Sequence, residues 1–326
     1  MAGRLRRLTG PRPATRARRL LLPAAPGPAR RGPAAAAAVA AGGEAAADVD
    51  VRAVLASCVR ACDRGCREVR AWQAARTAAT AVELKDAGDP KSAVTAADLA
   101  AQAAIVAALR AEWPGLAVVG EEDGAVPVAL AADRGDPGDP GAAPPLELPG
   151  VAGAKPVEVP LAELTVLVDP VDGTRELVEG RVGAVQTLVG VAYRGRALAG
   201  AVGVPFPGGS AAAEPVVHYG LVGAGFGGGV VEAGPGGTGF REAAPETGGR
   251  TRAGPAYTTG DSRDPSLAAA KGVLEASCTT SAPEWVPMGA AGNKFLAVAR
   301  GEVDAALVGR GFGAPETEPR RTSRPD

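Results

Sequence analysis

The sequence predicts an α/β fold in which amphipathic helices pack against a β-sheet. Residues 48–83 and 97–113 place apolar side chains three and four positions apart, which is the spacing of one helix face. Residues 116–119 and 164–168 are short apolar runs with the length and composition of buried strands. Residues 185–204 contain two apolar stretches around a turn at Gly195, which indicates an antiparallel strand pair. Helices therefore alternate with strands, as they do in α/β proteins.

The first predicted helix should cover the core of the sheet, because its apolar residues repeat as far as Trp72. Cys58, Cys62 and Cys66 share that spacing. A soft-metal or redox cluster is one interpretation of these thiols. Since no Cys-x-x-Cys pair or histidine accompanies them, small thiols buried in the core are favoured.

Proline and glycine residues mark the ends of the remaining predicted elements. Pro114 stops the second helix, and two further helices are predicted near 266–276 and 291–300. Residues 131–160 are rich in proline and glycine without periodicity, which favours a long surface insertion. Residues 223–228 satisfy Gly-x-Gly-x-x-Gly, but more glycines follow where a dinucleotide fold needs a helix, so we expect a flexible loop.

Composition excludes several classes of function. The chain has 326 residues, 46% of them apolar, a formal net charge of −1, one histidine and four cysteines. Histidine-rich zinc sites, a Ser-His-Asp triad and a disulfide scaffold are therefore disfavoured. Aromatic residues make up only 3%, which argues against a stacking platform for single-stranded nucleic acid, and no apolar run is long enough to span a membrane. No protein partner is evident from the sequence.

Charge is unevenly distributed along the chain. Residues 1–43 contain nine arginines and no acidic residue, and the first acid is Glu44. An arginine-rich, alanine-rich leader of this kind is typical of an organelle transit peptide, so we expect a chloroplast or mitochondrial location. The alternative is a basic arm that binds nucleic acid. The rest of the chain is acidic, which disfavours a nucleic-acid polymer as partner but is compatible with a local cation site.

Two predicted strands end in acidic clusters. Glu121 follows the strand at 116–119, and Asp169 and Asp172 follow the strand at 164–168. Taken singly, each cluster is typical of a solvated loop. Carboxylates that leave neighbouring strand ends can converge, however, and hard oxygen ligands suit Mg²⁺, with the carbonyl of Val171 as a further donor. If a helix starts near Gly173, its free amides also provide a phosphate cradle, and the combination indicates phosphoryl chemistry.

The sequence resembles the inositol monophosphatase superfamily of metal-dependent, lithium-sensitive phosphatases. Three motifs stand in the family's order, at 94–98, 120–122 and 169–174, and 257–259 and 289–294 fit later segments. The resemblance implies a layered αβαβα sandwich. Within the superfamily, the chain is most similar to the 3′(2′),5′-bisphosphate nucleotidases. These remove the 3′-phosphate of 3′-phosphoadenosine 5′-phosphate, a small phosphorylated nucleotide of sulfur metabolism, to give AMP.

The resemblance also implies a role for particular residues. The Mg²⁺ ligands would be Glu121, Asp169, the carbonyl of Val171 and Asp172. Thr174, paired with Asp89 of the loop 86–92, would orient and help deprotonate the attacking water. The amides of Gly173 and Thr174 would hold the scissile phosphate, while Lys294 and Thr259 would contact the nucleotide. Asp98 would be structural.

One departure from the family's pattern lies near the end of the chain. The family has a further ligand aspartate before an Ala-Pro pair, and Gly311 stands at that position here. We therefore expect a leader at 1–43, an N-terminal metal-binding domain at 44–207 and an incomplete C-terminal α/β domain at 208–326. An inositol phosphate monophosphatase, or a catalytically degenerate nucleotide-binding protein, are the alternatives to an active nucleotidase.

Overall fold

The structure is a computed structural model of the chain. It describes residues 48–76, 83–84, 93–122, 146–234, 237–242, 254–260, 265–278 and 281–308. Backbone contacts divide the chain into Met1–Ala45 and Ala46–Asp326, and every described residue belongs to the second unit. The expected leader at 1–43 therefore lies outside the described residues.

Two long helices open the described region, where the periodicity predicts them. Helix α1 (Val51–Ala75) begins at Asp50, whose carboxylate accepts a hydrogen bond from the amide of Arg52, and it ends eight residues before the predicted limit. Helix α2 (Ala96–Glu112) has Thr95 as its N-cap residue, and Thr95 and Asp98 form a capping box at its N-terminus. No described helix is long and apolar enough to cross a membrane.

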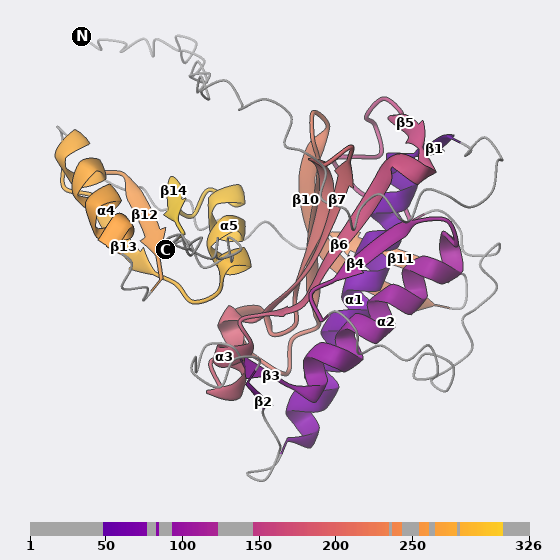
Figure 1. Cartoon of the computed structure of the whole chain (residues 1–326), viewed down its shortest axis with the longest axis horizontal. Coiled ribbons are helices and arrows are strands. Elements are labelled where there is room, and N and C mark those ends of the chain that lie inside the picture. Colours follow the sequence, from indigo (N-terminus) through magenta and orange to yellow (C-terminus); the bar gives the residue numbers. More distant parts are fainter. Residues whose placement is uncertain are drawn as a thin grey trace, which may run out of the picture. The chain divides into compact units, whose positions relative to one another are not determined.

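Helices α1 and α2 pack against a seven-stranded sheet, which confirms the predicted α/β class (Figure 1). Its strand order is β11-β10-β9-β8-β7-β6-β4, with β4 parallel to β6 and every other neighbouring pair antiparallel. The strands are β4 (Ala117–Gly120), β6 (Leu164–Asp172), β7 (Gln186–Tyr193), β8 (Arg196–Val204), β9 (Val216–Leu221), β10 (Gly225–Gly234) and β11 (Gly237–Glu242).

A second, smaller sheet follows the first along the chain. Its three parallel strands are ordered β13-β12-β14. They are β12 (Ala256–Thr259), β13 (Glu284–Pro287) and β14 (Ala305–Leu307), and they accompany helices α4 (Pro265–Ser277) and α5 (Ala291–Ala299). The remaining pairs are β1 (Asp48–Asp50) with β5 (Glu158–Pro160), and β2 (Glu83–Leu84) with β3 (Ala93–Val94).

The core lies between the large sheet and the two helices, which cover one of its faces. Alternate residues of β6, namely Leu164, Val166 and Val168, are buried against α1 and α2, as strand geometry requires. Two features differ from the prediction. Strands β9 to β11 continue the large sheet past the expected boundary at 207, and residues 146–160 pack into the core through four buried apolar side chains. These are Leu146, Leu148, Val151 and Val159.

The glycine-rich stretch expected as a flexible loop is a turn followed by strand β10. Its glycines permit close backbone approach, because a Cβ at Gly225 would lie 2.3 Å from the carbonyl oxygen of Gly150. At Gly227, a Cβ would lie 2.7 Å from the hydroxyl of Tyr219. These glycines serve sheet packing, which agrees with the rejection of a dinucleotide site.

The three cysteines of α1 are free and buried, as predicted. Burial raises the pKa of Cys58 to about 12 and raises that of Cys62 as well, so these thiols stay protonated. They pack against Gly203 of β8, where a Cβ would lie 2.3 Å from the sulfur of Cys66 and 2.9 Å from that of Cys62. The glycine is therefore required by the thiols.

Changing Gly203→Ala should lower the free energy of unfolding by about 1–3 kcal/mol, because the new methyl overpacks the cysteine sulfurs. Cys66→Ala in the same chain should recover part of this loss by making room, and denaturant unfolding of the four proteins measures the coupling. Gly190→Ala on β7 is the matched control, since its added Cβ meets nothing within 4 Å. Additive effects of Gly203→Ala and Cys66→Ala would contradict this packing.

Candidate active site

Two acidic strand ends meet at one edge of the large sheet. Strands β4 and β6 are parallel neighbours with Gly120 opposite Val168, and the amide of Glu121 donates to the carbonyl of Val168 at 2.9 Å. Glu121 and Asp169 therefore follow the same rung of the sheet. The sequence places acids directly after β4 and in the last residues of β6, and the parallel pairing brings these two positions together.

Asp169 is the most perturbed carboxyl group of this edge. Burial, together with the negative charges of Glu121 and Asp172, raises its pKa to about 9. Its Oδ1 is buried and has no hydrogen-bond partner among the described residues. A buried acceptor beside two other acids is electrostatically unfavourable unless a cation or a proton compensates it.

Asp172 ends β6 and faces the start of helix α5. Its carboxylate oxygens accept from the backbone amides of Ala291, at 3.1 Å, and Gly292. Burial raises the pKa of Asp172, while these two amides and the charge of Lys294 oppose the shift. Gly292 is required here, because a Cβ would lie 2.8 Å from Oδ2 of Asp172.

A glycine turn then directs the chain into helix α3 (Thr174–Val178). Gly173 has a φ of 93°, which other residues rarely adopt. The turn points the hydroxyl of Thr174 at two acceptors, Oδ1 of Asp98 and the carbonyl of Val171, both at 3.0 Å. The predicted ligand carbonyl and the predicted catalytic threonine are therefore in direct contact.

Asp98, expected from the sequence to be structural, also contacts Thr174. It caps α2 as expected, since its Oδ2 accepts from the amide and the hydroxyl of Thr95 at 2.8 and 2.7 Å. Its other oxygen is the partner of Thr174. Burial raises the pKa of Asp98, and the hydrogen bonds from Thr95 and Thr174 oppose that rise. Asp89, the predicted partner of Thr174, lies outside the described residues, so its role stays a prediction.

The two residues expected to contact a nucleotide come from the second sheet region. Lys294 is buried on α5, and its ammonium group donates to the carbonyl of Ala290 at 2.6 Å. A Cβ on Gly260 would lie 3.3 Å from Nζ of Lys294, so the lysine head lies beside the residue that follows Thr259. Thr259 ends strand β12.

The acids at the ends of β4 and β6 lie at one edge of the sheet but do not form a complete metal site. Within the part of the chain that the structure describes, no three of its His, Cys, Asp and Glu side chains are gathered closely enough to hold a metal ion. Glu121 is exposed, whereas its neighbour Glu122 is buried. The donor chemistry nevertheless suits Mg²⁺, since the available ligands are carboxylate and carbonyl oxygens and one carboxylate oxygen of Asp169 has no partner.

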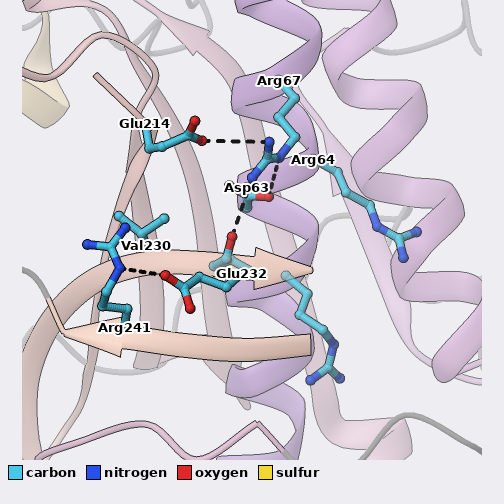
Figure 2. Close-up of a pocket in the computed structure, with 9 residues that line it drawn as sticks. Asp63, Arg64, Arg67, Glu214, Val230, Glu232 and Arg241 are labelled. Atoms are coloured by element: carbon cyan, nitrogen blue, oxygen red, sulfur yellow. Dashed lines mark hydrogen bonds and ion pairs between the residues drawn. The ribbon is translucent and has the colours of Figure 1, made fainter. Parts of the chain in front are cut away.

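A cavity of about 570 Å³ lies between α1 and the β10–β11 hairpin, and none of the residues above lines it (Figure 2). Its arginines are largely neutralised by neighbouring acids. Arg67 pairs with Asp63 at 2.7 Å, and Arg241 pairs with Glu232. Because these charges compensate one another, we assign this cavity no part in phosphate chemistry.

Comparison with curated proteins gives nucleotidase relatives, including those of two organisms. The 3′(2′),5′-bisphosphate nucleotidase 1 of Dictyostelium discoideum is 34% identical over 134 residues, which are 38% of this chain and 38% of that protein. The protein of the same name from Rattus norvegicus is 36% identical over 115 residues, or 34% of this chain and 35% of that protein. The match thus spans little more than a third of each relative.

Among solved structures, CysQ from Bacteroides thetaiotaomicron, a bacterial member of the inositol monophosphatase family, aligns with 18% identity and a TM-score of 0.49. The alignment covers 78% of each chain. The model of the inositol monophosphatase family matches residues 55–313, which is well over half of the sequence. The chain therefore belongs to the inositol monophosphatase family.

Proposed function

We propose that this protein is a Mg²⁺-dependent phosphatase that releases the 3′-phosphate of 3′-phosphoadenosine 5′-phosphate and leaves AMP, inside a chloroplast or mitochondrion. Membership of the family and the nucleotidase relatives support phosphate-ester hydrolysis. One observation carries the proposal for this chain. A buried carboxylate, Asp98, accepts a hydrogen bond from the hydroxyl of Thr174, which follows the strand that carries the unpartnered oxygen of Asp169.

The contact between Thr174 and Asp98 can activate water. With its proton directed to Asp98, the hydroxyl oxygen of Thr174 is free to accept a hydrogen bond from a water molecule. Asp98 can then take the threonine proton as the threonine takes one from water, which is general base catalysis through a hydroxyl relay. The capping bonds from Thr95 hold Asp98 in place for this role.

Residues at the ends of β4 and β6 would hold Mg²⁺. Asp169, Asp172, the carbonyl of Val171 and Glu121 offer oxygen donors of the kind that this ion prefers. When bound, Mg²⁺ lowers the pKa of water and neutralises charge on a transferring phosphate. The amides of Gly173 and Thr174 would orient that phosphate.

The substrate assignment depends on the nucleotidase relatives and on the second sheet region. Lys294 supplies a buried cation close to Thr259, where a nucleotide could be held. The family match equally admits an inositol phosphate, which makes inositol monophosphatase activity the second candidate. A third candidate is a degenerate nucleotide-binding protein, because Gly311 stands where a further metal-binding aspartate is expected.

The proposed function is tested by phosphate release from 3′-phosphoadenosine 5′-phosphate and from inositol 1-phosphate over a Mg²⁺ titration. We expect the nucleotide to give the higher kcat/KM and Asp169→Asn to abolish Mg²⁺-dependent turnover, because the variant replaces an anionic ligand with a neutral amide. A higher kcat/KM for inositol 1-phosphate would instead make the protein an inositol monophosphatase. AMP binding without any turnover would identify the degenerate alternative.

Asp169→Asn should also stabilise the metal-free protein at high pH. The pKa of Asp169, about 9, stands above its ordinary value of 3.8. Between these values the folded state holds a proton that the unfolded state releases, so the wild-type free energy of unfolding falls as the pH rises. In EDTA, the Tm of the variant minus that of wild type should therefore increase from pH 5.5 to 8.5. A difference that shrinks over this range would show that Asp169 is not buried among acids.

A further inference from the structure

Gln102 lies one turn beyond Asp98 on helix α2, and its side chain is buried. Its Nε2 donates to the carbonyl of Glu122 at 2.9 Å, and its Oε1 accepts from the amide of Glu122 at 3.0 Å. One side-chain amide therefore satisfies both backbone groups of a single residue. Paired bonds of this kind fix a backbone segment in the way that a neighbouring strand would.

The segment held by Gln102 contains the predicted metal ligand Glu121. On one side of Glu121, Gly120 leaves space for the glutamine, since a Cβ there would lie 2.3 Å from Oε1 of Gln102. On the other side stands the doubly bonded Glu122. The amide of Glu121 itself donates to Val168 of β6. The backbone of Glu121 is thus fixed from both directions, although its side chain is exposed.

We propose that Gln102 is a positioning residue that holds Glu121 at the acidic edge of β6 for binding of a divalent cation. This inference rests on the proposed function and deepens it. Residues four apart lie on one face of a helix, so Asp98 and Gln102 lie on the same buried face of α2. Asp98 holds Thr174, and Gln102 holds the turn after β4.

The size of the effect follows from the behaviour of metal sites. Residues that orient a ligand without contacting the ion typically change metal affinity by about 10–100-fold when they are replaced. Gln102→Met keeps the length of the side chain and removes both hydrogen bonds. Gln102→Glu keeps the acceptor for the amide of Glu122 but turns a second acceptor toward its carbonyl. Leu99→Met, at a position of α2 that is 37% exposed, is the matched control.

The experiment measures Mn²⁺ binding to the substrate-free protein by electron paramagnetic resonance, with near-UV circular dichroism and Tm in EDTA as tests of folding. We expect both Gln102 variants to raise the Kd for Mn²⁺ at least about tenfold, while Leu99→Met binds as wild type does. A merely structural role would lower Tm and leave the Kd of the folded molecules unchanged.

A folded Gln102 variant with wild-type Mn²⁺ affinity would overturn the positioning role and leave the proposed function standing. Loss of the fold in both metal-free variants would also overturn it, because the glutamine would then be structural. A wild-type protein that binds no Mn²⁺ would overturn the proposed metal dependence together with this inference. The two failures are therefore distinguishable.

Discussion

The hydrogen bond from Thr174 to Asp98 joins helix α2 to the end of strand β6, and the candidate site depends on it. It requires the capping box that places Asp98 at the start of α2 and the left-handed turn at Gly173 that redirects the chain after Asp172. It also requires α2 to pack on the sheet face that buries Val166 and Val168. Helix capping, strand alternation and one glycine turn therefore produce a pair of residues that neither element supplies alone.

The same edge concentrates negative charge in a region of low dielectric. Asp98, Asp169 and Asp172 all have raised pKa values, and burial is the largest cause in each. Such an arrangement costs stability in the absence of a counterion. Carboxylates with perturbed pKa values cluster at functional sites, where charge is needed. The amides of Ala291 and Gly292 compensate only Asp172.

Local patterns predicted much of this structure. Apolar periodicity located both long helices, and the acidic strand ends located Glu121, Asp169 and Asp172 at one edge because β4 and β6 are parallel neighbours. The partner of Thr174 could not be predicted from sequence spacing. Asp98 caps α2, and this local role already explains its position in the sequence without the contact to Thr174. Sequence patterns do not predict the strand at 225–234, because its glycines permit close backbone approach at Gly225 and resemble those of a flexible loop.

We propose that Asp98 and Thr174 act as one unit in water activation. A double-mutant cycle with Thr174→Val and Asp98→Asn, measured as kcat for 3′-phosphoadenosine 5′-phosphate at saturating Mg²⁺, tests it most directly. Each single variant should lose at least about a hundredfold in kcat, the scale of general base catalysis. The double variant should lose little more than either single one, because both remove the same relay. Multiplied losses in the double variant, or wild-type kcat in Thr174→Val, would contradict this account.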